Sequence, residues 1–380
     1  MIKTWAFEFN IPLGPDIVDY TDEKVVQRAF DDTLEHVARC EDLGFEGVFF
    51  SEHHFISTLS PSPHLLIAAS APRTRNLKLG VMGSVLGFHE PWRMTEELGM
   101  LDYITEGRLE IGVASGVPSE FLFLDIPQSE VRPRFQEFLK YLDVAAKQPT
   151  VDFEGEYFNY KQLPVLPRLK DVGRRRKWMT VYSAGTCRLA AQLGYRVCTG
   201  AQSVENATKA FDAYREEADK IGYETTPDDF GIRRSVLLGE TDEEAKELFE
   251  RVNPVSLARL EASFVPVNER LKSVLGDNAM APVLKSGVKD AAAPQRSPEE
   301  SHLPDHSKAE TPKFEDVADF NDEFIIGSPT TVAEKIIDQC RRMGGSQFLG
   351  MHQMALTKDE FNQHYSYWEK VNEILRKADV

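Results

Sequence analysis

Short apolar runs alternate with amphipathic segments along most of the chain. The segment after the first run carries Phe30, Leu34, Val37 and Ala38 at i, i+4, i+7 and i+8, the spacing of one helix face. Strands are predicted at Thr4–Phe9, Gly47–Phe50, Leu77–Val81, Leu109–Val113, Met179–Val181, Arg196–Thr199, Ile232–Leu238 and Gln347–Met351. Further helices are predicted at Leu65–Ala71, Met94–Tyr103, Arg134–Ala146, Thr186–Leu193, Ala207–Ile221, Asp242–Val252, Thr330–Met343 and Lys358–Lys377.

Strands that alternate with helices indicate right-handed βαβ units and a parallel sheet, which is an α/β fold. Eight such units favour a closed (β/α)8 TIM barrel formed by one domain over residues 1–380. An open Rossmann-like sheet is the alternative. The residues after the first strand disfavour it, because Asn10–Gly14 reads NIPLG and carries no GxGxxG motif.

Residues 266–320 depart from this alternation. The stretch is polar and rich in Pro, Ala, Ser and Lys, and its prolines disfavour a long helix or strand. We expect an insertion near the barrel mouth that is partly mobile and closes over the site. A passive solvated excursion on the far face is the alternative.

Charge and cysteine content narrow the function classes. The 380 residues include 44 basic and 61 acidic side chains, a formal charge of −17, which disfavours nucleic acid and anionic membranes as partners. The cysteines show no CxxC spacing, so neither a disulfide framework nor a zinc site is expected; they are Cys40, Cys187, Cys198 and Cys340. No signal-peptide pattern and no apolar run of about 18 residues is present, so a cytoplasmic location is expected.

The sharpest local motif is Ser51-Glu52-His53-His54-Phe55, which follows the second predicted strand. The carboxyl ends of barrel strands face the active site. Adjacent histidines cannot point the same way, so one of the two is expected to face the barrel mouth. There it can donate a hydrogen bond to a bound oxygen species or act as a general base. A structural histidine bonded to a neighbouring loop is the alternative.

Two glycine-containing stretches lie at other predicted strand ends. Gly80–Leu86 reads GVMGSVL, and glycine at a strand end permits close approach of a ligand ring. Taken alone, this stretch favours a simple strand with a tight turn. Gly107–Gly116 ends in small residues. As a phosphate loop it is weak, because it lacks the lysine of a P-loop.

Two hydroxyl-rich segments precede predicted helices. Tyr182–Thr186 reads YSAGT, and backbone N–H groups and hydroxyls at a helix N-terminus form an anion site without basic side chains. Ordinary capping by Ser183 or Thr186 is compatible with that reading. Gly327–Thr331 is interpreted mainly as a capping segment, with Pro329 near the first turn.

Together these residues resemble the bacterial luciferase-like flavin monooxygenases. The resemblance rests on GFEGVFFSEHHF, on SPSPHLLIAASAPRTRNLKLGVMGSVLGFHEPWRMTEELGMLDYITEGRLEIGVASG, and on the later landmarks VYSAGTCRLAAQLG and FIIGSPTTVAEKI. It covers nearly the whole chain except about residues 254–320. It implies a (β/α)8 barrel that uses reduced FMN from a separate flavin reductase. The flavin reacts with O2 to give a C4a-hydroperoxide, which oxygenates a small organic substrate.

The resemblance also implies roles for particular residues. His53 matches the family's catalytic histidine, and His54 is expected to point away and support packing. Ser183 and Thr186 match its phosphate-contacting hydroxyls, and Met82–Gly83 matches the site of a non-proline cis peptide beside the flavin. The full set of implied flavin-binding residues is Met82, Gly83, Ala114, Ser115, Tyr182, Ser183, Ala184, Gly185 and Thr186. No metal is implied.

Two departures from luciferase bear on chemistry. Ala114 and Ser115 stand where luciferase has a cysteine and an arginine that pairs with the flavin phosphate, and Tyr182 stands where it has a glutamate. Phosphate binding would therefore rely more on Ser183, Thr186, backbone amides or a basic residue elsewhere. Light emission from a long-chain aldehyde is not expected.

Two other functions fit the same family. An F420-dependent oxidoreductase would transfer hydride rather than oxygen, and a non-catalytic flavin-binding protein would keep the barrel alone; the intact EHHF disfavours the latter. The family also implies a homodimer. Aromatic residues expected near an apolar substrate pocket are Phe7, Phe9, Phe55, Phe88 and Trp92.

Overall fold

The computed structural model describes residues 1–378 apart from 18, 125, 170–172, 174–175, 264, 267–268 and 271–321. The predicted insertion at 266–320 therefore lies almost wholly outside the described residues. Within the described ranges, no helix is long and apolar enough to cross a membrane.

Eight parallel strands close into a barrel. In ring order they are β10 (Phe230–Leu238), β12 (Gln347–Met351), β1 (Lys3–Glu8), β2 (Gly47–Phe50), β3 (Lys78–Val81), β5 (Leu109–Ala114), β8 (Lys177–Thr180) and β9 (Arg196–Thr199). The ring closes because β10 pairs with β9 on one side and with β12 on the other. These are the eight strands that the sequence predicts, so the predicted (β/α)8 barrel is confirmed.

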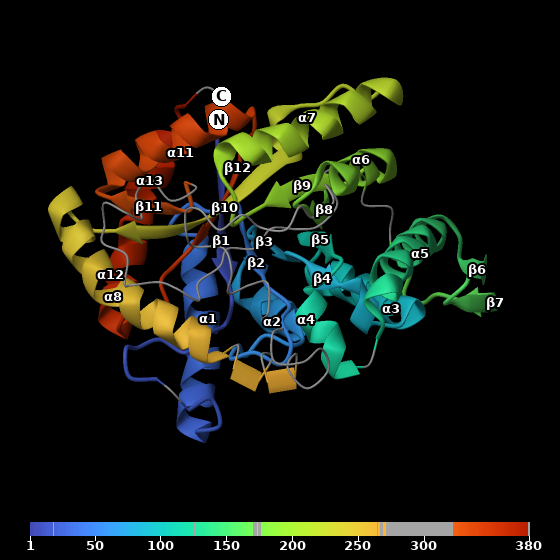
Figure 1. Cartoon of the computed structure of the whole chain (residues 1–380), viewed down its shortest axis with the longest axis horizontal. Coiled ribbons are helices and arrows are strands. Elements are labelled where there is room, and N and C mark those ends of the chain that lie inside the picture. The colour runs from blue at the N-terminus through green and yellow to red at the C-terminus, as the bar shows by residue number, and fades with distance from the viewer. Residues whose placement is uncertain are drawn as a thin grey trace.

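The structure adds strands that the sequence analysis did not predict. The longest barrel strand, β10, pairs with β12 through its first half and with the additional strand β11 (Phe324–Gly327) through its second half. The short β4 (Ser84–Val85) pairs with β5. An antiparallel hairpin of β6 (Thr150–Glu154) and β7 (Asn159–Pro164) lies outside the barrel beside α5 (Figure 1). The hairpin was missed because its residues are largely exposed and polar, without a continuous apolar run.

Helices surround the strands (Figure 1). They are α1 (Glu23–Cys40), α2 (Pro63–Ser70), α3 (Pro91–Ile104), α4 (Pro118–Phe121), α5 (Gln128–Lys147), α6 (Ala184–Leu193), α7 (Val204–Lys220), α8 (Asp242–Ser263), α11 (Pro329–Met343), α12 (Lys358–Ser366) and α13 (Trp368–Leu375). Short 3-10 turns lie at Ala71–Arg73, Leu86–Phe88, Leu122–Leu124 and Pro227–Asp229. The long helix predicted at Lys358–Lys377 is two helices that meet at Tyr367.

The buried face of α1 differs from the predicted one. It carries the polar residues Thr33 and His36 beside Val37, while Phe30 and Leu34 are only partly buried. Thr33 donates from Oγ1 to the Asn10 side chain at 2.8 Å, and His36 Nε2 lies 3.1 Å from a Glu8 carboxylate oxygen. The prediction counted only apolar positions, whereas these polar groups are buried because β1 and its loop supply partners.

Large rings fill the lower part of the barrel interior. Trp5, Phe49 and Trp178 pack with Leu349 in one cluster, and their ring centroids lie 4.7 to 5.8 Å apart. The indole N–H groups have acceptors: Trp5 donates to Gln347, and Trp178 donates to Glu110 at 2.6 Å. Because side chains fill this layer, a ligand can enter the barrel only on the side of the layer that faces the carboxyl ends of the strands.

Candidate active site

A cavity of about 410 Å³ opens at the carboxyl ends of the barrel strands. This volume is in the usual range of ligand pockets, and the lining is mostly apolar, as such pockets are. Of the residues predicted to form the site, those that line it are His53, Met82, Gly83, Ala114, Ser115 and Tyr182. Phe7 and Phe9 line it as well, whereas Phe55, Phe88 and Trp92 are not part of its lining, which corrects the predicted aromatic pocket.

His53 is held at the cavity by two neighbours. Its Nδ1 lies 3.0 Å from Oε1 of Glu120, whose carboxylate is almost fully buried in the short helix α4. Its ring stacks on Phe9 at a centroid distance of 5.4 Å and an interplanar angle of 11°. The carboxylate favours the tautomer with the proton on Nδ1. The opposite nitrogen, Nε2, is then an acceptor for a reacting group.

His54 belongs to a different cluster. Its Nε2 lies 3.2 Å from Oε1 of Glu52, and Nε2 of His89 lies 2.8 Å from the same oxygen. His54 also packs edge-on against the Phe88 ring and does not line the cavity. Burial alone would raise the pKa of Glu52, but hydrogen bonds from the two histidines lower it to about 2. The cluster therefore fixes the turn that presents His53.

The Met82–Gly83 edge of the cavity has a specific backbone. This peptide bond is cis. A Cβ at position 83 would lie 2.6 Å from the carbonyl of Val113, so a side chain there would collide with the neighbouring strand. Glycine therefore lets the connection between β3 and β4 approach β5 closely beside the cavity.

The predicted anion site lies next to the cavity at the N-terminus of α6. Ser183 is the N-cap of this helix, and its Oγ accepts from the Thr186 N–H at 3.3 Å and lies 3.1 Å from Thr186 Oγ1. Ser183, Ala184, Gly185 and Thr186 themselves are not in the cavity lining. Arg132 of α5 lies beside this N-terminus: its Nη2 is 3.4 Å from where a Cβ on Gly185 would stand. Sequence spacing gave no sign of this proximity.

The cavity also contains ionisable groups that the sequence analysis did not select as site residues. They are Glu52, Glu120, Arg233, Arg259, Glu323 and His352. Arg259 donates to the backbone carbonyls of Pro12, Gly14 and Met354. It thereby ties α8 to the loops after β1 and β12. Glu120 was not detectable because it lies 67 residues from its partner in a four-residue helix. Arg233 was detectable, since a charged residue inside an apolar strand needs buried partners.

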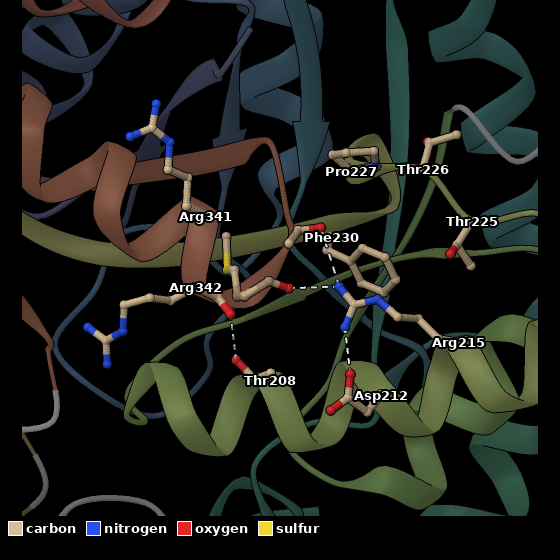
Figure 2. Close-up of a pocket in the computed structure, with 11 residues that line it drawn as sticks. Thr208, Asp212, Arg215, Thr225, Thr226, Pro227, Phe230, Arg341 and Arg342 are labelled. Atoms are coloured by element: carbon tan, nitrogen blue, oxygen red, sulfur yellow. Dashed lines mark hydrogen bonds and ion pairs between the residues drawn. The ribbon is translucent and has the colours of Figure 1, made fainter. Parts of the chain in front are cut away.

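A second, more open pocket lies at the opposite end of the barrel, between α7 and α11 (Figure 2). Arg215 crosses it and donates to Asp212 at 2.8 Å and to the Met343 carbonyl at 2.7 Å, with its guanidinium 4.2 Å from the Phe230 ring centroid. Figure 2 shows the side chains of Arg341 and Arg342 pointing away from Arg215. This pocket therefore presents no convergent set of charges.

No group of three or more His, Cys, Asp or Glu side chains is placed to hold a metal ion among the residues that the structure describes. The thiol in the cavity is Cys198. Burial raises the pKa of this thiol to about 12, so it stays protonated near neutral pH and is a poor nucleophile. The histidine–carboxylate pair of His53 and Glu120 is therefore a better candidate for acid–base chemistry in the cavity than this thiol.

A family model described as luciferase-like monooxygenase matches residues 13–347. Among curated proteins, the chain is 30% identical to the uncharacterized protein y4wF of Sinorhizobium fredii over 61% of this chain and 69% of that protein.

Solved structures share the fold. The monooxygenase RslO1 from Streptomyces bottropensis gives a TM-score of 0.75 at 20% identity, covering 97% of this chain and 98% of that chain. The oxygenating constituent of 3,6-diketocamphane monooxygenase from Pseudomonas putida, in complex with FMN, gives 0.71 at 20% identity, covering 100% and 99%. An F420-dependent secondary alcohol dehydrogenase gives 0.64 at 12% identity, covering 97% and 99%.

Proposed function

The chain belongs to the luciferase-like monooxygenase family, and on that premise we propose that it is the oxygenase component of a two-component system that uses reduced FMN and O2. Its substrate is a small organic molecule. The observation that carries the proposal is the His53–Glu120 pair, which stands at an apolar cavity directly beside a helix N-terminus suited to phosphate.

The residues beside α6 fit the phosphate of FMN. The first turn of this helix offers backbone N–H groups, Ser183 and Thr186 offer hydroxyls, and Arg132 brings a positive charge to the same place. Arg132 would thus supply the positive charge that luciferase supplies with an arginine at the position of Ser115. The isoalloxazine ring would lie in the apolar cavity against Met82, Gly83 and Tyr182.

When bound, reduced FMN supplies the two electrons by which one oxygen atom of O2 enters the product and the other leaves as water. His53 would accept or return a proton at Nε2 while Glu120 keeps the proton on Nδ1. An imidazole can both accept and donate a proton, which suits this task. The apolar walls of the cavity exclude water from the reacting groups.

The proposed partners are a flavin reductase and a second copy of this chain. The first follows from use of flavin as a diffusible substrate. The second is supported by large apolar side chains exposed on the adjoining helices α2 and α3: Leu65, Met100, Tyr103 and Ile104. We expect a sedimentation mass of twice 43.0 kDa at micromolar concentration, and we expect Leu65→Glu with Met100→Glu to give the monomer mass. A wild-type mass of 43.0 kDa would contradict the dimer.

The decisive experiment measures oxygen uptake with FMNH2 across aldehydes, ketones and aromatic acids, together with the mass of the product. The expected result is a product heavier by one oxygen atom, labelled when 18O2 is used. Reduced F420 is the comparison cofactor. Turnover with reduced F420 and without O2 would replace the proposal by hydride transfer. Flavin binding with no turnover on any substrate would favour a binding protein.

A further inference from the structure

Arg233 places a positive charge on the floor of the cavity. It extends from β10 into the barrel interior, where its guanidinium lies 5.9 Å from the Phe7 ring centroid and its Nη1 lies 3.6 Å from Met351 Sδ. Gly200 makes room for it, because a Cβ at that position would stand 2.6 Å from Nε of Arg233. A charge among apolar groups is costly unless it is paired.

The pairing of this charge is incomplete. Nη2 of Arg233 lies 2.9 Å from Oε1 of Glu323, but the same carboxylate also faces Arg234 at 3.5 Å and accepts from the Ala201 N–H at 3.0 Å. Arg234 is fully buried and donates to Gln339, away from the cavity. The Glu323 carboxylate therefore serves two guanidinium groups, and of these Arg233 is the one that lines the cavity.

Arg233 also has hydrogen-bond donors to spare. A guanidinium carries five N–H groups. Among the described residues, Arg233 directs one nitrogen to Glu323 and one to the Met351 thioether, which is a weak acceptor. Burial opposes its charge, but the Glu323 carboxylate raises the pKa of Arg233 above its ordinary value, so the group stays charged. The remaining donors point to a ligand with an anionic oxygen.

We propose that Arg233 is a specificity-determining residue that binds an anionic oxygen of the organic substrate: a carboxylate, a phenolate or an enolate. This inference rests on the proposed function and names the substrate class. The planar fork of arginine suits such oxygens, and the surrounding apolar floor suits the body of the molecule. The reduced flavin ring presents an anionic edge of the same chemistry, and the test separates the two sources.

The test compares acids with amides of the same shape. Binding of benzoate and phenylacetate, and of benzamide and phenylacetamide, is measured by calorimetry in the presence of FMN. The variants are Arg233→Met, Arg233→Lys and the charge-neutral double Arg233→Met/Glu323→Gln. Arg93→Met is the matched control, since Arg93 is exposed on α3 and its loss changes the net charge equally. Thermal unfolding checks that each variant is folded.

The expected result is a preference of wild type and Arg93→Met for the acids by about tenfold or more. This preference disappears in Arg233→Met and in the double variant, while amide affinity changes less than about threefold. Arg233→Lys keeps part of the preference for acids, because lysine retains the positive charge but lacks the planar guanidinium that can donate two parallel hydrogen bonds. Equal binding of acids and amides by wild type, or an acid preference that survives Arg233→Met, would overturn the proposal.

A second measurement tests whether Arg233 binds the reduced flavin rather than the substrate. Reduced and oxidised FMN are titrated anaerobically into wild type and Arg233→Met. If the variant loses affinity for reduced FMN and keeps its acid preference, Arg233 serves the flavin and the substrate assignment is wrong. Failure of the proposed function is distinct from both outcomes, because it appears as absent oxygen uptake by wild type whatever the preference for acids.

Discussion

The two ends of the barrel use arginine in opposite ways. At the amino end of the strands, Arg215 gives its donors to the Asp212 carboxylate and to the Met343 and Gly344 carbonyls (Figure 2). At the carboxyl end, Arg233 shares one carboxylate with Arg234 and keeps donors toward a cavity. Both lie near an aromatic ring. A pocket beside an arginine is therefore not enough to identify a binding residue. The distinguishing feature is whether the guanidinium N–H groups already donate to protein acceptors.

The histidines repeat this contrast within the carboxyl end. Each of three histidines turns one ring nitrogen to a buried carboxylate: His54 and His89 turn Nε2 to Glu52, and His53 turns Nδ1 to Glu120. Of the three, His53 is the one that lines the cavity. The same chemical pair, imidazole with carboxylate, thus supports the turn in one case and faces the cavity in the other. The predictions below test whether groups that face the cavity act on ligands or turnover, and whether groups that face other parts of the protein act on stability.

The largest effect is expected for His53→Ala. Loss of a general acid–base group lowers product formation by about 100- to 10,000-fold. Affinity for FMN should change little, because the phosphate residues lie elsewhere. Oxygen uptake and product formation are measured separately from flavin binding. His54→Ala is the control, and it should lower stability more than turnover. Full oxygenation by His53→Ala together with its loss in His54→Ala would reverse the assignment.

Glu52 should contribute to stability in a pH-dependent way. Its pKa is about 2 in the folded protein against 4.5 as the reference, so its contribution of about 3 kcal/mol is present above pH 4.5 and is lost as pH falls toward 2. Burial lowers the pKa of His89, but its hydrogen bond to Glu52 outweighs burial and raises it. The stability that protonated His89 contributes is therefore fully present below pH 6.5 and is lost as the pH rises through the raised pKa of His89.

The measurement is urea unfolding of wild type and Glu52→Gln from pH 3 to pH 8. The difference in unfolding free energy should be greatest between pH 4.5 and 6.5 and should shrink toward pH 3. Glu205→Gln is the control, since Glu205 is an exposed helix residue paired with Lys209. A difference that does not vary with pH would show that the hydrogen bonds to Glu52 do not require its charge.

Arg215→Met tests the opposite end of the barrel. Removing the guanidinium leaves the Met343 carbonyl without this donor, which costs about 1–3 kcal/mol of unfolding free energy. Turnover and flavin affinity should stay at wild-type values. Arg188→Met is the control, because Arg188 is half-exposed and makes a long 3.5 Å contact with Glu216. If Arg215→Met lost ligand binding but not stability, the assignment of Arg215 as a structural arginine would be wrong.

The sequence predicted the barrel better than it predicted the site. Strand positions followed from apolar runs, because a strand buried on both faces reads as a continuous run. His53 was found because it directly follows such a strand. Glu120, Glu323 and Arg132 could not be found that way, since long-range folding rather than local spacing brings them to their partners. The prediction of the buried face of α1 was wrong for a related reason. Thr33 and His36 are buried there because residues of another element supply their hydrogen-bond partners.

The smallest effect expected is on flavin affinity, from Arg132→Met. If Arg132 pairs with the phosphate, its loss raises the dissociation constant for FMN about tenfold, as removal of one charge-assisted hydrogen bond does. Riboflavin, which lacks the phosphate, should bind wild type and variant equally. Arg134→Met is the matched control, because Arg134 lies two residues along the same helix and pairs with Glu130 at 3.1 Å. If riboflavin affinity falls as much as FMN affinity, Arg132 supports the fold of this corner, and α6 binds the phosphate through Ser183, Thr186 and its backbone amides alone.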